Sequence, residues 1–149
     1  MPTALAFYHL TTTPLDAALP RLVEKALASG RRVLIQTGAK ARTEMLDDLL
    51  WSYDPNSFLP HGSARDGHAE TQPVWLTDAD ENPNGAQILF LVDAATSPLT
   101  GQMERCLVVF DGRDDAAVAR ARTAWKDYKA QGCSLQYFRQ SDDGRWVSQ

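Results

Sequence analysis

The chain has 149 residues, with a formal net charge of −4, 44% hydrophobic residues and 23% charged residues. This length fits a single domain, residues 1–149, that buries roughly two thirds of the surface of its unfolded form, so no metal or disulfide is needed to hold it. The negative charge excludes a protein that binds nucleic acid through its overall charge. Any anion site must come from a local basic cluster.

Apolar runs with turn signals between them predict most of the strands. Five are predicted in the first part of the chain and its centre, at residues 4–10, 32–37, 74–77, 88–93 and 106–111. Residues 134–140 predict a further strand, and Asp-Asp-Gly at 142–144 predicts a tight turn into a last strand at 145–147.

Helical periodicity appears in three places between these strands. The predicted helices cover residues 15–28, 41–51 and about 115–131. In the second helix four side chains are predicted to face the core, Met45, Leu46, Leu49 and Leu50. Strands separated by helices predict an α/β fold, a three-layer, mostly parallel, Rossmann-like sheet with helices on both faces and the last hairpin at one edge.

The N-terminus and the cysteines bear on the compartment. No apolar run is long enough to span a bilayer, and MPTALAFYHL lacks the basic start and cleavage site of a signal peptide. We therefore expect a cytoplasmic protein without membrane contact. Cys106 and Cys133 show no zinc-site spacing, which favours two reduced thiols.

The strand ends offer little for catalysis. The turn Thr37-Gly38-Ala39-Lys40 resembles a phosphate loop only faintly, because it lacks the second glycine and the Lys-Ser/Thr ending. It nevertheless leaves a small nucleotide-binding enzyme on a Rossmann-like fold as the alternative function.

The irregular region 52–72 is long enough to be functional. It contains His61, Asp66, His68 and Glu70, whose spacing matches no known metal pattern, so we interpret it as a hydrophilic loop with two exposed histidines. No metal and no cofactor are predicted.

The last helix separates an apolar stripe from a basic face. The stripe consists of Ala117, Ala121, Ala124 and Tyr128. The basic face carries Arg122, Lys126 and Lys129, with Trp125 at its border. An arginine beside an exposed aromatic ring suits a carboxylate next to an apolar side chain. A solvated basic face, with the tryptophan covering a loop, remains open as the alternative.

Several segments together resemble the chi subunit of bacterial DNA polymerase III, an accessory protein of the clamp-loader complex. They are FYHL, GRRVLIQT, LDDLLWSYDPNSFLPHG, PVWL and ARTAWKDYKAQG, which span nearly the whole chain. The resemblance implies a non-catalytic bridge with a nucleotide-binding-like α/β fold. One face of such a bridge takes the acidic C-terminal tail of single-stranded DNA-binding protein, which ends in an aromatic residue and a free carboxylate, and another takes the psi subunit where one is present.

Matching the motifs assigns residues to both faces. The tail site would contain Arg122, Trp125 and Lys126, with Lys129 drawing in acidic residues, and the psi site Trp51, Phe58 and Pro60. The chain departs from the family pattern at Val118, where the better-known members carry a lysine, and at the turn 38–40, which is usually acidic. A direct nucleic-acid binder using the basic helix is the second alternative, although no strong direct binding is expected.

Overall fold

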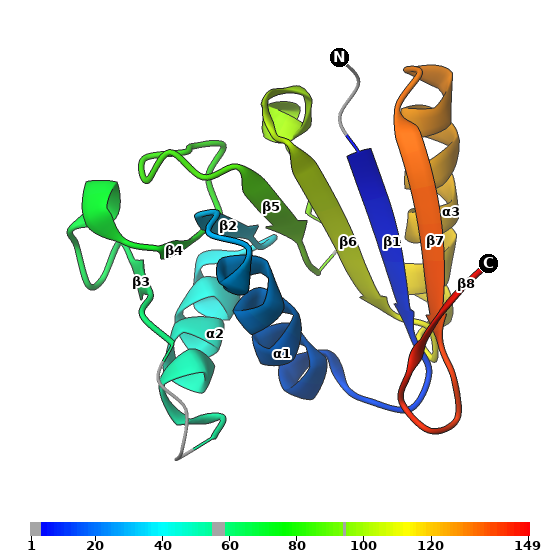
Figure 1. Cartoon of the computed structure of the whole chain (residues 1–149), viewed down its shortest axis with the longest axis horizontal. Helices are drawn as coiled ribbons and strands as arrows, with labels where there is room; N and C mark the ends of the chain where they lie inside the picture. Colours follow the sequence, from blue (N-terminus) through cyan, green and yellow to red (C-terminus); the bar gives the residue numbers. More distant parts are fainter. Residues whose placement is uncertain (1–3, 55–58, 94) are drawn as a thin grey trace.

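The computed structural model describes residues 4–54, 59–93 and 95–149 of the chain. Its strands are β1 Ala4–Leu10, β2 Val33–Gln36, β3 Gly62–Ser63, β4 Val74–Thr77, β5 Ile88–Leu91, β6 Arg105–Asp111, β7 Ser134–Gln140 and β8 Trp146–Ser148. The α-helices are α1 Leu15–Ala28, α2 Lys40–Ser52 and α3 Asp115–Ala130 (Figure 1). The strand and helix predictions are confirmed to within a few residues, but the two-residue strand β3 was not predicted.

The strands form one sheet in the order β3-β4-β2-β5-β6-β1-β7-β8. Every described pairing is parallel except that of β7 with β8, which is antiparallel. The predicted mostly parallel sheet and the position of the last hairpin at an edge are therefore confirmed. The N-terminal strand β1 lies between β6 and β7, so it is an interior strand.

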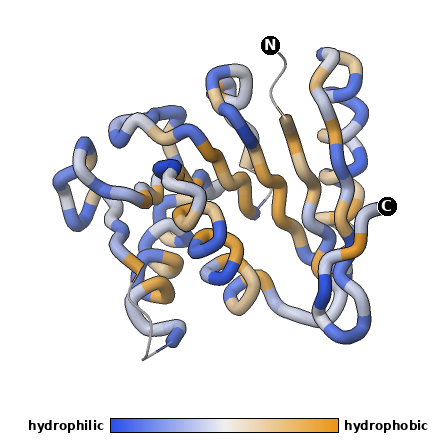
Figure 2. Tube along the Cα trace, viewed as in Figure 1, coloured by the Kyte–Doolittle hydropathy of each residue, from blue (hydrophilic) through white to orange (hydrophobic). Residues whose placement is uncertain are grey.

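Two hydrophobic clusters cover the two faces of the sheet. Helices α1 and α2 pack on one face, where Leu19 and Leu46 are fully buried against strand residues such as Ile35. Helix α3 packs on the other face, where Ala121 and Tyr128 are buried over β1 and β6. Figure 2 shows the hydrophobic stretches gathered in the central strands. The three-layer arrangement with helices on both faces is confirmed.

One of the four predicted core positions of α2 is wrong. Leu46 and Leu50 are buried and Leu49 is partly buried, whereas Met45 is 53% exposed. On the same turn of the helix Asp47 is fully buried instead, and its carboxylate accepts hydrogen bonds from neighbouring polar groups inside the protein. A hydrophobic pattern cannot show this, because it assigns every carboxylate to the solvent side.

The loop between β1 and α1 is held by one side chain. The amide oxygen of Gln140, at the end of β7, accepts hydrogen bonds from the backbone N–H groups of Thr11, Thr12 and Thr13 at 3.0–3.2 Å. In a dinucleotide-binding fold the backbone of this first loop faces the pyrophosphate. Here the corresponding N–H groups are already occupied, which argues against the nucleotide-binding alternative.

Candidate partner-binding sites

Helix α3 begins at a well-formed N-cap. The carboxylate of Asp114 accepts hydrogen bonds from the N–H groups of Ala116 and Ala117, and Asp115 adds negative charge to the first turn. The helix then lays its alanine-rich stripe on the sheet, with Ala121 and Tyr128 buried and Ala117 partly buried. Small side chains on this stripe let the helix approach the strands closely and direct its basic side away from them.

A groove of about 350 Å³ runs between α3 and strands β6 and β7. We call it the α3 groove; its lining residues are Phe110, Val118, Ala121, Arg122, Trp125, Lys126 and Tyr137. Three of the four residues predicted for the tail site line it together. The fourth, Lys129, is exposed on the next turn of α3 and does not line the groove.

The aromatic rings of the groove are fixed by packing. Trp125 is partly buried, and its ring meets Phe7 edge to face at a centroid distance of 5.3 Å and Tyr137 at 5.8 Å. Its partial burial agrees with the prediction that Trp125 lies at the border of the basic face. The hydroxyl of Tyr137 lies 2.5 Å from Nδ1 of His9, so the groove wall is tied to β1. An aromatic side chain entering the groove would therefore meet rigid rings.

The cationic side chains of the groove have no partner among the described residues. Arg122 and Lys126 are exposed, and neither makes a hydrogen bond or ion pair with any residue that the structure describes. By contrast, Arg42 binds the carboxylates of Asp16 and Asp93 at 2.8 and 2.7 Å. An unpaired arginine beside fixed aromatic rings is available to bind a carboxylate from outside.

Sequence reasoning missed two residues that line this groove, Tyr137 and Phe110. Val118, noted from the sequence as a departure from the family pattern, also lines it and contributes an apolar wall where the better-known members carry a lysine. Nearby, the pKa of His9 is lowered, mainly by burial and further by the charges of Arg139 and Arg122. The alternation of side chains along residues 134–140 puts Tyr137 and Arg139 on one face of the strand, and this pattern could have indicated both residues.

Gly112 leaves room for His9. A Cβ atom at position 112 would lie 1.9 Å from Nε2 of His9 and 2.6 Å from the carbonyl oxygen of Leu10. Any larger residue would push the imidazole away from Tyr137, so the shape of the α3 groove depends on this glycine.

A second hollow lies on the other side of α3, between the helix and strands β5 and β6. Its volume is about 390 Å³, and its lining is mostly apolar, with Leu91 and Ala124 among the lining residues. It is also lined by one cation, Arg120, and one carboxylate, Asp127. This mixed charge suits an acidic peptide less well than the α3 groove does.

The end of α2 forms the second predicted site. Trp51 is 52% exposed, and its ring lies over the imidazole of His61 at a centroid distance of 4.3 Å. Pro60, which precedes His61 in the sequence, is partly buried. Leu59 is buried in the core with Leu46 and Leu50. Phe58, the third predicted residue, lies outside the described residues. Among its described residues the loop thus buries Leu59 and His61, whereas Trp51, at the end of α2, remains exposed.

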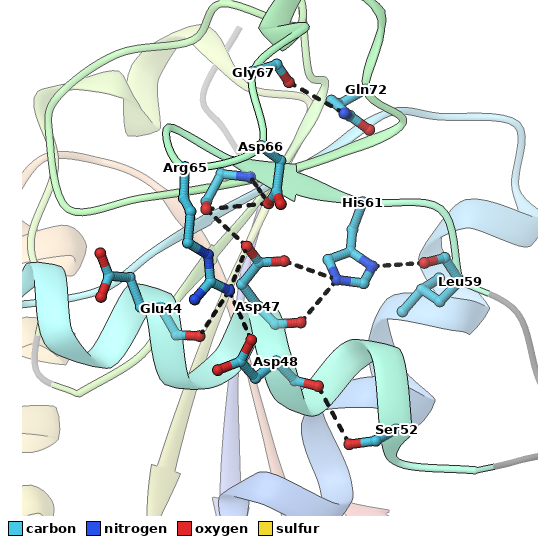
Figure 3. Close-up of polar contacts among 11 residues, drawn as sticks. Glu44, Asp47, Asp48, Ser52, Leu59, His61, Arg65, Asp66, Gly67 and Gln72 are labelled. Atoms are coloured by element: carbon cyan, nitrogen blue, oxygen red, sulfur yellow. Dashed lines mark hydrogen bonds and ion pairs between the residues drawn. The ribbon is translucent and has the colours of Figure 1, made fainter.

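Beneath Trp51, His61 connects the loop to α2. Its Nδ1 lies 2.6 Å from the carbonyl oxygen of Leu59, and its Nε2 lies 2.9 Å from both the carbonyl oxygen and the carboxylate of Asp47 (Figure 3). Both side chains are fully buried. The interpretation of two exposed histidines in this loop is therefore wrong for His61, although His68 is exposed.

Other groups complete the environment of Asp47. Its carboxylate accepts hydrogen bonds from the Ser63 hydroxyl at 2.8 Å and from Arg65 at 3.0 Å. Burial is the largest cause that raises the pKa of Asp47, and the neighbouring carboxyl of Asp66 adds to it. Although aspartate, histidine and serine meet here, the serine hydroxyl bonds to the aspartate and not to the imidazole. The cluster therefore lacks the nucleophile–base contact that a hydrolase triad requires.

Two further observations concern chemistry and membranes. Among residues 4–54, 59–93 and 95–149, no group of three or more His, Cys, Asp or Glu side chains is placed to hold a metal ion. Within the same part of the chain, no helix combines the length and the apolar character needed to cross a membrane. The hollow beside the Gly38–Lys40 turn is lined by two carboxylates, Glu44 and Asp78, and by two cations, Lys40 and Arg65, so its charges balance and give no clear preference for a phosphate.

The family model described as DNA polymerase III chi subunit, HolC, matches residues 1–136. The chain belongs to this family. It is 32% identical to a probable DNA polymerase III subunit chi of Rickettsia prowazekii over 105 residues, which cover 70% of this chain and 64% of that protein. It is 27% identical to the chi subunit of Haemophilus influenzae, covering 87% of this chain and 92% of the relative.

A third relative supports the same membership. The chi subunit of Pseudomonas aeruginosa is 30% identical over 139 residues, 90% of this chain and 94% of the relative. Membership of the chi family places the chain among the accessory, non-catalytic subunits of DNA polymerase III and excludes the nucleotide-dependent enzyme as its main function. This conclusion agrees with the occupied first loop of the sheet.

Proposed function

We propose that this chi-family protein bridges the clamp loader of the replicative DNA polymerase to single-stranded DNA-binding protein. The α3 groove binds the acidic C-terminal tail of the binding protein. The exposed Trp51, with Pro60 and Phe58 in the following loop, belongs to the face that contacts the psi subunit, or a substitute for it.

The observation that carries the proposal is the unpaired arginine beside a packed aromatic groove. A tail that ends in an aromatic residue offers a ring and a carboxylate a few ångströms apart. The groove offers fixed rings in Trp125 and Tyr137 and an unpaired guanidinium in Arg122. The guanidinium fork binds a carboxylate with charge-assisted hydrogen bonds, while Lys126 and Lys129 attract the acidic residues that precede the end of the tail.

The test compares intact single-stranded DNA-binding protein with a form that lacks its last few residues. The intact protein should bind the chi-family chain in a pull-down and by calorimetry, and the truncated protein should not. A bare single-stranded oligonucleotide serves as the control. Equal binding of the two protein forms, or strong binding of the oligonucleotide that falls steeply with salt, would contradict the proposal and favour a direct nucleic-acid binder.

Lys129→Ala should weaken tail binding only slightly. The side chain is exposed and does not line the α3 groove, so its contribution is a screened attraction of about 0.2 to 1 kcal/mol. The main effect should be a smaller dependence of the dissociation constant on salt. Titrations of a tail peptide at several salt concentrations check this. A loss as large as that of a groove residue would mean that the peptide follows α3 farther than proposed.

Trp51→Ala should weaken binding of the psi-side partner by about 1 to 2 kcal/mol, because an exposed tryptophan is a typical interface anchor. Tail binding at α3 should not change. Calorimetry with psi, or with the clamp-loader complex where psi is absent, measures the first effect, and a tail-peptide titration measures the second. Unchanged affinity for both partners would remove Trp51 from the proposed face.

A further inference from the structure

Part of the sheet is left without a covering helix. Parallel sheets usually carry helices over both faces. On the face covered by α1 and α2, strands β1 and β7 have no described helix in front of them, whereas α1 packs on β6 (Figure 1). Between α1 and the β7–β8 hairpin the surface forms a groove of about 730 Å³, larger than the α3 groove. We call it the α1 groove, with Tyr8, Leu107 and Phe138 from the sheet and Trp146 from β8 among its lining residues.

The α1 side of this groove contains three alanines. Ala17, Ala18 and Ala26 line it, together with Leu22 and the long side chains of Arg21 and Lys25, whose charged ends can remain in solvent. The distance between packed helices falls when the residues at their contact are small. The wall therefore allows a second helix to lie beside α1, at the place where a fully covered sheet would carry one of its own.

The aromatic residues of the groove form an apolar floor. Tyr8 packs against Phe138 at a centroid distance of 5.1 Å and against Trp146, edge to face, at 4.8 Å. Because these rings pack on one another, they do not form a row of separate platforms for nucleic-acid bases. This arrangement favours a protein side-chain stripe over a single-stranded nucleic acid.

The charges of the groove are positive. Lys25 and Arg105 line it and are exposed, and neither forms an ion pair or hydrogen bond within the described part of the chain. Arg21 also lines the groove, but its guanidinium forms ion pairs with the carboxylates of Glu24 and Asp54 at 3.7 and 3.5 Å. No carboxylate is among the lining residues. A matching partner therefore carries acidic residues.

We propose that the α1 groove binds an amphipathic helix of a partner protein, with acidic residues on both sides of its apolar stripe. The apolar stripe covers Tyr8, Leu107 and Trp146, and the acidic residues meet Lys25 and Arg105. This surface is separate from the tail site, because α3 lies on the opposite face of the sheet and the two grooves share no lining residue. It gives the protein a third contact face, beyond the two of the proposed bridge.

The experiment uses the full chain and a synthetic helical peptide of about 18 residues, long enough for five turns. The peptide carries leucines at helical spacing flanked by glutamates, and a scrambled peptide of the same composition is the control. The helical peptide should bind, and NMR shifts should map to Tyr8, Leu107 and Trp146. The double substitution Lys25→Glu and Arg105→Glu should weaken binding about tenfold or more, since it places like charges together. The matched reversal Arg120→Glu and Lys40→Glu, at exposed positions that line neither groove, should leave it unchanged.

Five results would overturn the proposal. Two concern the peptide itself: absence of binding at about 1 mM peptide, and equal binding of the scrambled peptide. A third is a set of NMR shifts that maps to the α3 groove, and a fourth is self-association of the chain that the Lys25 and Arg105 reversals abolish. A fifth is binding of oligo(dT) at the α1 groove, where three phosphate contacts would make log K fall with log salt at a slope of about −2. Tail binding by the doubly reversed variant, measured in parallel, shows whether the domain and the proposed tail site remain intact.

Discussion

His61→Ala is expected to destabilise the domain by about 3 to 5 kcal/mol, the range found when one member of a buried charged or polar pair is removed. The imidazole is fully buried and contacts the carboxylate of Asp47 and the carbonyl oxygen of Leu59. Its loss removes the imidazole contact of both acceptors, although Asp47 keeps Ser63 and Arg65, and opens a cavity beneath Trp51. For a domain of this size the melting temperature should fall by about 6 to 20 °C, measured by calorimetry or circular dichroism.

His68→Asn is the matched control for this prediction. His68 is exposed in the same loop and has a left-handed backbone with φ of 58°, a conformation that asparagine tolerates well. The control should melt within about 2 °C of the parent protein, since exposed substitutions usually change stability by about 0.5 kcal/mol or less. If His61→Ala had the same melting temperature as the His68→Asn control, the imidazole of His61 would not hold the loop onto α2.

Arg122→Ala is expected to weaken binding of the tail peptide by about 1.5 to 3 kcal/mol, a loss of roughly tenfold to a hundredfold. The guanidinium lines the α3 groove beside Trp125. Because it makes no hydrogen bond or ion pair with the described residues, its removal should cost little in folding stability. Calorimetric titration and a melting curve of the same sample measure the two effects separately.

Two controls make this prediction specific. Arg120→Ala removes the same side chain from α3, but at a position that lines the hollow on the other side of the helix, so it should leave tail affinity nearly unchanged. Amidating the peptide's C-terminus removes the carboxylate charge and keeps the aromatic ring, so it should mimic Arg122→Ala in the parent protein. If the amidated and free peptides bound equally well, Arg122 would not be the carboxylate partner.

The sheet was largely predictable because its strands are short, buried and rich in branched residues. Strands β5 and β6 are apolar runs between turn residues, and Gly132 marks the end of α3 as expected. The two-residue strand β3 could not be predicted in this way, since two small residues carry no periodicity. Its pairing depends on β4 and on the Asp47 cluster, which are tertiary features.

The two candidate sites differ in how much of each the sequence revealed. On α3 the period of the helix brings Arg122, Trp125 and Lys126 to one side, so spacing alone grouped them. Tyr137 and His9 come from strands that are paired in space but lie far apart in the chain, and a single sequence does not show that pairing. The burial of His61 was missed for a related reason, because its acceptor Asp47 lies on another element.

The place of β1 in the sheet also constrains how the protein folds. Ala4, at the start of the chain, pairs with Arg105 on one side and with Ser134 on the other. Contacts so distant in sequence require large loops to close before they contribute energy, which slows folding. During synthesis the first strand must wait until its partners at residues 105–111 and 134–140 have left the ribosome. Its backbone N–H and C=O groups remain unpaired and its apolar side chains uncovered in that interval, so the nascent chain is most vulnerable to aggregation before these two strands arrive.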